Sequence, residues 1–419
     1  MSERIAVVGT GISGLTAAYL LARRNELVVY EANDYIGGHS HTVEVTDGDR
    51  AMGVDTGFIV YNERTYPNFC RLLDLMGVAT QPSDMTFSFR NDRTGQEYAV
   101  PELSRLFCRK SNLLRPKFLQ MIRDIFRFYK EAPRLLAAGD ANPDLDLATY
   151  LEQEGYSRTF QDDHIFPMAE SIWSGSRREL GAFPVQSFLR FFQNHGLLSL
   201  NDRPLWRTVS GGSINYVNKL TASFREAIRL NTPVRSVRRD GDGVDITTAE
   251  GGVERFDKVI LACHADEALA MLDAPSNLER EILGSFPYAA NDVALHSDAS
   301  VMPQRRAAWS AWNYHRDDRP DRPVALTYGM NLLQGLPTET PYLVTLNRND
   351  DLVAGLVHDR FVYHHPQYNM RGIANQPRHD ELNGRSRTYY CGAYWGYGFH
   401  EDGVASALRV ARHFGETLP

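Results

Sequence analysis

The sequence predicts an α/β protein with a Rossmann-like parallel sheet and a second α+β domain, which carries a mixed or antiparallel sheet and a helical subdomain. Three observations lead to this prediction. The chain opens with a short apolar strand, a glycine-rich turn and a helix, over residues 4–24. A buried strand at residues 256–263 and a strand followed by a helix at residues 389–414 have the same character. The stretches between them are rich in aromatic and basic residues and lack this pattern.

The composition is that of a globular chain long enough for two domains, with 419 residues, of which 43% are hydrophobic and 23% charged. The net charge of -7 argues against a nucleic-acid-binding protein. No run of eighteen apolar residues and no signal peptide are found, so we expect a cytoplasmic protein. The cysteines are widely spaced, which predicts reduced thiols and no metal site; they are Cys70, Cys108, Cys263 and Cys391.

The first segment has the features of a dinucleotide site. The strand RIAVV, residues 4–8, leads directly into G-T-G-I-S-G and a strong helix former. Gly9 permits the tight turn, Gly11 lets the backbone approach a pyrophosphate, and Gly14 allows close packing of helix on strand. The phosphates would lie at the helix N-terminus, where the first residues are Ile12 and Ser13.

A second expected strand, LVVYE, ends at Glu31 and is followed by Ala32. An acid at this position accepts hydrogen bonds from the ribose hydroxyls of a dinucleotide and repels a 2′-phosphate. A glycine motif alone could be an ordinary tight turn. Strand, glycines, helix, strand and acid in this order favour a dinucleotide site.

Two more motifs follow, Gly37-Gly38 with Thr42 after it, and Asp55-Thr56-Gly57-Phe58. The order G-x-G-x-x-G, E, G-G-x-x-x-T and D-x-G resembles the flavin-containing amine oxidase superfamily. That superfamily includes monoamine oxidases, protoporphyrinogen oxidase and carotenoid desaturases. The resemblance implies an FAD cofactor, held by a sheet of the glutathione-reductase type.

The same resemblance implies roles for single residues. The doublet and Thr42 would contact the FAD phosphates. The superfamily usually has arginine where this chain has His39, and a neutral histidine donates less strongly to a pyrophosphate or ribityl oxygen. His39 could instead be a structural loop residue or a site of covalent flavin attachment. The cofactor candidates of this segment are Gly37, Gly38, His39, Thr42, Gly57, Phe58 and Ile59.

Later segments complete the resemblance. In relatives a strand lays its backbone against the adenine, and the strand 256–263 returns to the dinucleotide sheet. A last helix, expected to begin at Gly403-Val404, would point its N-terminus at the flavin pyrimidine ring and stabilise negative charge there. Glu401 and Asp402 are expected to cap this helix. The cofactor candidates here are Val234, Ala262, Gly392, Gly403 and Val404.

With motifs at both ends of the chain, the FAD-binding domain is expected to be discontinuous. It would contain residues 1–80, 205–270 and 380–419, and a substrate domain with a helical cap would contain residues 81–204 and 271–379. Several segments look most like a bacterial subfamily of NAD/FAD-binding proteins, some of them linked to modification of membrane fatty acyl chains. Without a second G-x-G-x-x-G, the electron acceptor stays open between oxygen, a quinone and a carrier protein.

The substrate region is rich in aromatic residues, which suits a long apolar chain or a flat ring. Amine oxidases usually place a lysine near flavin N5, and neither Lys219 nor Lys258 is expected there. Phe399 also stands where relatives carry a tyrosine of the aromatic pair. No catalytic residue is assigned. The pocket candidates, each of which could be ordinary core, are Tyr61, Asn62, His364, His365, Trp395 and Phe399.

These observations predict an FAD-dependent oxidoreductase that removes a hydride from an apolar, fatty-acyl or other lipid-like substrate. One alternative is a flavin amine oxidase that produces peroxide. Another is a non-catalytic FAD-binding partner of a lipid-modifying enzyme.

Residues 105–134 form a separate basic segment, with nine basic residues against Asp124 and Glu131 and a local net charge of +7. Apolar residues recur within it at helical spacing; they are Phe118, Met121, Ile122, Ile125, Phe128 and Tyr129. Such a helix can lie on an anionic membrane, here the inner membrane face. The alternative is a helix that packs on the core and exposes a solvated basic side.

Overall fold

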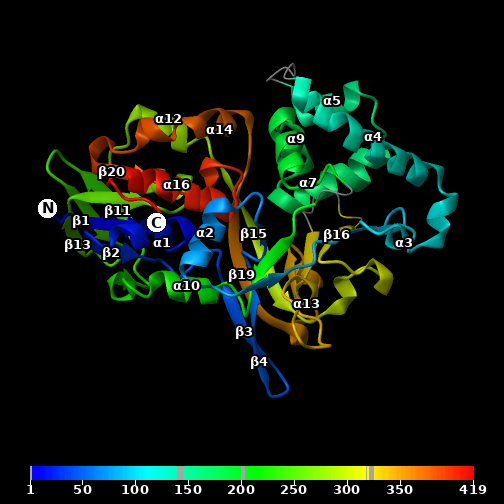
Figure 1. Cartoon of the computed structure of the whole chain (residues 1–419), viewed down its shortest axis with the longest axis horizontal. Coiled ribbons are helices and arrows are strands. Elements are labelled where there is room, and N and C mark those ends of the chain that lie inside the picture. The colour runs from blue at the N-terminus through cyan, green and yellow to red at the C-terminus, as the bar shows by residue number, and fades with distance from the viewer. Residues whose placement is uncertain (1, 139–144, 200–202, 318, 320–324) are drawn as a thin grey trace.

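The structure is a computed structural model that describes residues 2–138, 145–199, 203–317, 319 and 325–419. Its parallel sheet lies at one side of the molecule, close to both termini (Figure 1). The strand order is β10-β2-β1-β14-β20. These strands are β1 (Arg4–Val8), β2 (Glu26–Tyr30), β10 (Ile228–Arg229), β14 (Lys258–Leu261) and β20 (Thr388–Tyr390).

Both faces of this sheet are buried, as the continuous apolar runs predict. In β1, Ile5 and Val7 belong to one core, which includes helices α1 (Ile12–Leu21), α10 (Ile214–Thr221) and α16 (His400–Arg412). Ala6 and Val8 belong to a second core under an antiparallel sheet on the other face. That sheet contains β11 (Val234–Arg239), β12 (Val244–Thr248) and β13 (Val253–Phe256). The two-residue period of a strand therefore divides β1 between two cores.

A second large sheet has seven strands in the order β19-β15-β18-β17-β16-β7-β8. All pairs in it are antiparallel except β16 with β7, which are parallel. Its strands are β7 (Phe87–Asn91), β8 (Gln96–Val100), β15 (Tyr288–His296), β16 (Trp312–Arg316), β17 (Ala325–Gly329), β18 (Leu343–Leu346) and β19 (Val357–Pro366). This confirms the predicted fold class, a parallel α/β sheet beside a mixed sheet.

Smaller elements link the two sheets. The hairpin of β3 (Thr42–Asp47) and β4 (Arg50–Asp55) projects from the body in Figure 1. A three-stranded sheet joins β5 (Tyr61–Asn62), β9 (Trp206–Val209) and β6 (Thr80–Pro82). The remaining helices outside the helical region are α2 (Pro67–Leu75), α11 (Ala265–Met271), α12 (Asn277–Leu283), α13 (Met330–Leu333), α14 (Met370–Asn375) and α15 (His379–Leu382).

A helical region between β8 and β9 lies on the side opposite the parallel sheet (Figure 1). It packs around an aromatic core that includes Phe118, Phe160 and Phe188. Its helices are α3 (Leu103–Leu106), α4 (Pro116–Ala138), α5 (Leu147–Gln153), α6 (Arg158–Phe160), α7 (Phe166–Trp173), α8 (Arg177–Gly181) and α9 (Val185–Asn194). Among the described helices, none combines the length and the apolar character needed to cross a bilayer.

Three sequence-based expectations are corrected here. The basic segment is not one helix, because a 3-10 turn at Lys110–Leu114 separates α3 from α4, which starts at Pro116. Proline is favoured in the first turn of a helix, and Pro116 opens α4. The last helix begins at His400, three residues before Gly403, because Asp402 caps the preceding loop. The strand expected at 256–263 is shorter, and Phe256 belongs to β13.

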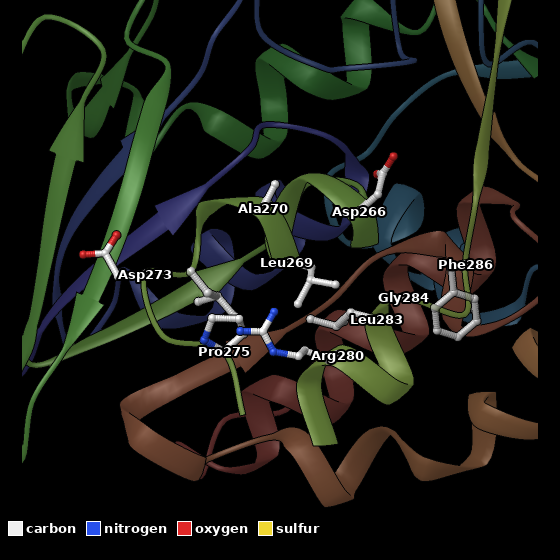
Figure 2. A pocket seen from close by; sticks show the side chains of 10 residues that line it. Asp266, Leu269, Ala270, Asp273, Pro275, Arg280, Leu283, Gly284 and Phe286 are labelled. Carbon is white, nitrogen blue, oxygen red and sulfur yellow. The ribbon is translucent and has the colours of Figure 1, made fainter. Parts of the chain in front are cut away.

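A cavity of about 490 Å³ lies between α11 and α12 (Figure 2). Leu269, Leu283 and Phe286 form its apolar side, and Asp273 and Arg280 its polar side. Its lining includes none of the candidate site residues. It is therefore separate from the predicted cofactor site.

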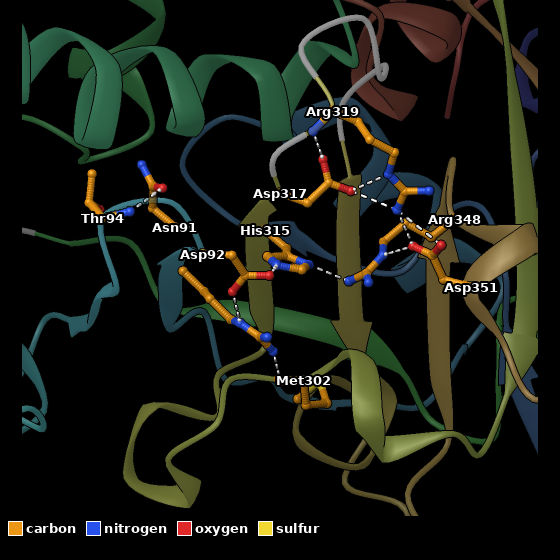
Figure 3. Close-up of polar contacts among 10 residues, drawn as sticks. Asn91, Asp92, Thr94, Met302, His315, Asp317, Arg319, Arg348 and Asp351 are labelled. Carbon is orange, nitrogen blue, oxygen red and sulfur yellow. Dashed lines mark hydrogen bonds and ion pairs between the residues drawn. The ribbon is translucent and has the colours of Figure 1, made fainter.

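A polar network ties the mixed sheet to its neighbouring turns (Figure 3). His315 Nε2 lies 2.7 Å from Asp92 Oδ2, and the Arg348 guanidinium donates to His315 Nδ1. Because Nδ1 accepts, the proton of a neutral ring is on Nε2 and is donated to Asp92. Burial and Arg348 lower the pKa of His315, so it stays neutral and crosslinks β16 with the turns after β7 and β18.

A buried ion pair joins three segments of the parallel-sheet region. Arg239 of β11 pairs with Glu279 of α12, and their side chains are 8% and 7% exposed. The Tyr390 hydroxyl of β20 donates to the same carboxylate at 2.5 Å. Removing one partner would leave the other charge buried and unpaired.

We therefore expect Glu279→Ala to lower the free energy of unfolding by about 3–5 kcal/mol. The matched control is Glu281→Ala on the same helix, where Glu281 is 53% exposed and pairs with Arg378. This control should cost at most about 1 kcal/mol. Chemical denaturation of the three proteins measures both values, and equal losses would show that the buried pair has no special weight.

Candidate functional site

Four loops that carry predicted cofactor residues meet at one edge of the parallel sheet. Gly9 follows β1, Glu31 follows β2, Ala262 follows β14 and Gly392 follows β20. These four strands are neighbours in the sheet and run in the same direction. Their carboxyl ends lie at the same edge, which is where open α/β sheets bind ligands.

The three glycines of the first loop have different surroundings. A Cβ atom on Gly14 would lie 2.1 Å from the Gly9 carbonyl oxygen, and one on Gly9, whose φ is +104°, 2.9 Å from that of Ala262. Both positions require glycine because backbone approaches backbone there. A Cβ atom on Gly11 would meet nothing within 4 Å among the described residues. Gly11 therefore faces open space, which a pyrophosphate group could occupy.

Gly11 is also the N-cap of α1, and no described side chain caps this helix. The first backbone N–H groups of a helix have no partner within the helix. Those of Ile12, Ser13 and Gly14 belong to this first turn, beside the open space at Gly11. This is a suitable site for an anion such as a diphosphate.

Glu31 links the first two motifs. Its Oε2 atom accepts hydrogen bonds from the backbone N–H and the hydroxyl of Thr10, and Oε1 accepts from the Asn33 N–H at 2.9 Å. The Thr10 hydroxyl in turn accepts from the Gly37 N–H at 3.1 Å. An ionised carboxylate has about four acceptor positions, so one stays available for a ribose hydroxyl. Ala32 is exposed beside it, at the rim.

The glycine doublet lies directly against the first loop. A Cβ atom on Gly38 would be 3.1 Å from Gly11 Cα. The next residue, His39, has a buried Nε2 atom without a hydrogen-bond partner among the described residues. Its ring centroid is 5.6 Å from that of His365 and 6.1 Å from that of His264. Burial and the neighbouring histidines lower the pKa of His39 well below its usual range.

A ring nitrogen of His39 without a partner, and the glycine doublet lying against the open space at Gly11, fit the phosphate groups of a dinucleotide. These residues therefore suit the predicted FAD, while the role of each one stays a prediction. His365 was a pocket candidate in the sequence, whereas His264 was not singled out there. Because His264 is the N-cap of α11 and His365 is in β19, only the fold brings them together with His39.

Thr42 has a structural role at this site. Its hydroxyl donates to Asp55 Oδ1 at 2.5 Å and accepts from the Ile214 N–H at 3.0 Å. Asp55 also accepts two hydrogen bonds from Ser213, one from the backbone N–H and one from the hydroxyl. Burial raises the pKa of Asp55 to about 6. The Thr42 hydroxyl is thus already engaged within the protein, and its predicted contact with a phosphate stays a prediction.

The D-x-G motif packs against the last helix. The Phe58 ring stacks on His400 at 3.5 Å, and the Phe58 N–H donates to the His39 carbonyl at 2.7 Å. Gly57 also lies against the His39 backbone, and the Ile59 carbonyl accepts from the Thr208 hydroxyl. The remaining cofactor candidates lie at the first residue of β11 (Val234) and within α16 (Gly403 and Val404).

Phe399 is the N-cap of α16 and contacts both the core on the α1 side of the parallel sheet and the core of the helical region. Its ring stacks with Phe191 of α9 at 5.3 Å and lies 5.7 Å from His195. Asp402 accepts hydrogen bonds from the Tyr397 and Phe399 N–H groups and so holds this loop. The result is a cluster of aromatic rings at the start of α16, the aromatic wall, formed by Phe191, His195, Tyr397 and Phe399. Phe191 and His195 are buried in it, whereas Tyr397 and Phe399 are half-buried.

The other pocket candidates have different surroundings. Tyr61 is in the core beside Phe69, and Asn62 caps a turn by accepting from the Arg64 and Thr65 N–H groups. Trp395 is buried with Phe286 and His379, away from the aromatic wall.

The two histidines of β19 differ in exposure. His365 lies near His39, and its Nδ1 atom is hydrogen-bonded to Asn291 Nδ2 at 3.1 Å. His364 is exposed.

Sequence reasoning missed Phe191 and His195, although a signal was present. Aromatic residues recur at positions 188, 191 and 192 of α9 and at its C-cap, position 195, the spacing of one helix face. The spacing predicts a buried face but does not indicate that this face packs against Phe399.

Comparison with known proteins agrees with this geometry. Residues 12–295 match the family described as flavin containing amine oxidoreductase. A Mycobacterium tuberculosis protein named as a flavin-containing monoamine oxidase is 23% identical, over 78% of this chain and 70% of its own length.

Solved structures are similar over almost the whole chain. The CLA-producing fatty acid isomerase from P. acnes has a TM-score of 0.69 at 17% identity, covering 98% of this chain and 99% of its own. Cyclohexylamine oxidase from Brevibacterium oxydans has a TM-score of 0.70 at 15% identity, covering 99% of this chain and 100% of its own. At these identities the likeness shows the fold.

Gly11→Val should fold normally and lose the cofactor, because the new side chain occupies space that only a ligand would fill. Purified protein should show the thermal stability of wild-type protein stripped of flavin, and no bound FAD. Gly14→Val is the contrasting variant, which should fail to fold because its Cβ meets the Gly9 carbonyl. Full FAD content in the Gly11→Val protein would show that the cofactor is placed wrongly.

Asp402→Asn tests the loop that holds Phe399. Burial raises the pKa of Asp402 to about 7, above its unfolded value of 3.8. The folded state therefore binds more protons between about pH 4 and 7, and wild-type stability falls as the pH rises through that window. The variant does not titrate there. Its free energy of unfolding relative to wild type should rise by about 1–3 kcal/mol from pH 4.5 to pH 7.5.

Denaturation curves at several pH values measure this difference. A flat difference for Asp402→Asn across the window would contradict the proposed burial of this carboxyl group.

Proposed function

Because this chain belongs to the flavin containing amine oxidoreductase family, we propose a lipid-like, apolar substrate for it. Membership of the family makes it a flavin-dependent oxidoreductase with FAD as its cofactor. The chain would remove a hydride from this substrate, as a dehydrogenase or desaturase of fatty acyl chains does. The observation that carries this proposal is the aromatic wall of Phe191, His195, Tyr397 and Phe399 at the start of α16.

Apolar side chains at this position favour an apolar substrate. Phe191 and Phe399 stack with an interplanar angle of 20°, and Phe191 stacks on His195 at 3.9 Å. Burial lowers the pKa of His195 to about 4, so the ring is neutral at physiological pH. A wall of neutral rings gains free energy by covering methylene groups. Because aromatic faces also attract ammonium groups, the choice between an acyl and an amine substrate rests on the lysines as well.

The positions of the lysines support the same choice. Lys219 donates to the carbonyl groups of Met76 and Gly77, and Lys258 pairs with Glu3. The other three lysines are in the basic segment of the helical region. Among the five, all within the described residues, none is at the aromatic wall, whereas amine oxidases usually hold a lysine near flavin N5.

The chain's own residues would position and shield the substrate. FAD, when bound, supplies the hydride acceptor. Gly11, Gly38 and His39 would hold its phosphates, and the first turn of α16 offers N–H groups to an electron-rich ring. Asp402 fixes the loop of Phe399, and the rings of the wall would exclude water and align an apolar chain.

The similar structures leave two substrate classes open. One of them is named for a fatty acid isomerase and another for a cyclohexylamine oxidase, on the same fold. The first name supports an acyl substrate. An amine oxidase that releases peroxide is the alternative, and a chain whose flavin no substrate reduces is the third outcome.

We expect unsaturated fatty acyl lipids to reduce the bound flavin under anaerobic conditions, and simple primary amines to leave it oxidised. The flavin absorbance in stopped flow reports the reduction, and mass analysis of the lipid should show the loss of two hydrogens. Hydride removal next to a double bond is favoured because the developing charge is delocalised. Rapid reduction by amines, with acyl lipids inert, would replace this proposal with the amine oxidase alternative.

Phe191→Ala tests the wall itself. Because Phe191 is only 2% exposed, removing its ring should also lower the free energy of unfolding by about 3–5 kcal/mol. In the protein that stays folded, the loosened wall should raise KM for the acyl substrate by about tenfold. FAD content should stay at the wild-type level. The control is Val362→Ala on β19, where Val362 is 56% exposed and far fewer contacts are lost.

A further inference from the structure

Helix α4 has two different faces. Its inner face contributes Phe118, Met121, Ile125 and Phe128 to the core of the helical region, and all four are less than 10% exposed. The apolar residues that the sequence analysis assigned to a membrane are therefore mostly buried in the protein. A membrane contact would therefore have to use the opposite face.

That opposite face is not simply polar. Residues at positions 119, 123, 126, 130 and 134 follow helical spacing and form an outer stripe of Leu119, Arg123, Phe126, Lys130 and Arg134. Leu119 is 44% exposed and Phe126 is 53% exposed. A solvated helix face gains nothing from large apolar side chains at these positions.

The 3-10 turn before α4 extends the apolar exposure. Leu113 is 54% exposed and Leu114 is 86% exposed, directly before the helix starts at Pro116. Two adjacent leucines in water are costly unless something covers them. In Figure 1 this end of α4 lies with α3 at the far side of the molecule from the parallel sheet.

The charges around these side chains are largely unpaired. Arg105 and Arg109 donate to backbone carbonyls, and Arg127 pairs with Glu131 and Glu154. The remaining cations form no close ion pair with a described residue, Arg123 reaching Asp124 only at 4.0 Å. These are Lys110, Arg115, Lys117, Arg123, Lys130 and Arg134.

We propose that the outer stripe of α4 and the turn Lys110–Leu114 form a docking surface for an anionic lipid bilayer. Leucine and phenylalanine side chains would enter the boundary of the acyl chains, while arginine and lysine head groups reach the lipid phosphates. Lysine is depleted in protein–protein interfaces, so this mixture favours a lipid surface over a protein partner.

Charge distribution gives the docking a direction. The segment 105–134 carries +7 in a chain of net charge -7, so the rest of the molecule is strongly acidic. An anionic bilayer therefore attracts this segment specifically, which lies at the far side of the molecule from the parallel sheet (Figure 1). The parallel sheet would face away from the membrane. This inference does not depend on which substrate the enzyme oxidises.

Co-sedimentation of the full-length, FAD-loaded protein with vesicles tests the proposal. Vesicles of phosphatidylcholine with phosphatidylglycerol should bind the protein, and vesicles of phosphatidylcholine alone should bind it at least about tenfold more weakly. Added salt should weaken binding as screening increases. Arg123→Glu with Lys130→Glu, and separately Leu113→Ser with Leu114→Ser, should each lower the binding constant by about tenfold or more.

Matched controls separate this surface from general effects. Arg23→Glu with Arg412→Glu makes the same change of charge at exposed residues on the side of the parallel sheet. Val253→Ser removes an exposed apolar side chain, 62% exposed, on β13. Both should bind like wild type, and all variants should keep their FAD.

Three outcomes would overturn the proposal. Equal binding to neutral and anionic vesicles would remove the role of charge. Control variants that lose as much binding as the test variants would remove the role of this surface. Absence of binding to any vesicle would exclude a lipid surface and favour a protein partner for the outer stripe.

Discussion

The parallel pairing of β1 with β14 joins Ile5 to Lys258 and the following residues in register, and β20 then adds to the far side of β14. Three segments that are distant in sequence thus become neighbouring parallel strands, whose carboxyl ends lie at the same edge of the sheet. Closing such long loops costs entropy that grows only slowly with their length, and burial of both sheet faces compensates for it. A dinucleotide that touches loops from several of these strands would bind the folded chain only, and so would stabilise it.

Two carboxylates near this edge organise the motif loops. Glu31 joins the loop of Thr10 to Gly37, and Asp55 joins β3 to the start of α10. Both are buried and both accept several hydrogen bonds, which offsets their loss of hydration. Residues of a cofactor motif therefore shape the backbone as well as face the ligand. Their substitution would disturb loop geometry and cofactor binding together.

Much of the parallel sheet could be predicted, because each strand carries a local signal. Apolar runs gave β1 and β2 within a residue, and the glycines after β1 lie where the turn requires them. The surroundings of Trp395 and His365 could not be predicted, since they depend on packing between segments far apart in sequence.

The basic segment shows the same limit. Its helical period was correct, but period alone does not say which side of α4 faces the core. Phe399 was noticed for its place before the last helix, whereas its partner Phe191 comes from a helix more than two hundred residues earlier. Side-chain surroundings follow from tertiary packing, so single motifs locate loops better than they locate pockets.

The scarcity of lysine has a practical consequence. Three of the five lysines, Lys110, Lys117 and Lys130, are exposed in the basic segment, while the ammonium groups of Lys219 and Lys258 are engaged by other residues. Amine-reactive dyes, crosslinkers and biosensor surfaces would therefore attach mainly at the helical end of the molecule. Protein immobilised in this way would present its flavin side to solution and hide the outer stripe of α4. Attachment through an exposed cysteine introduced elsewhere would keep that end free.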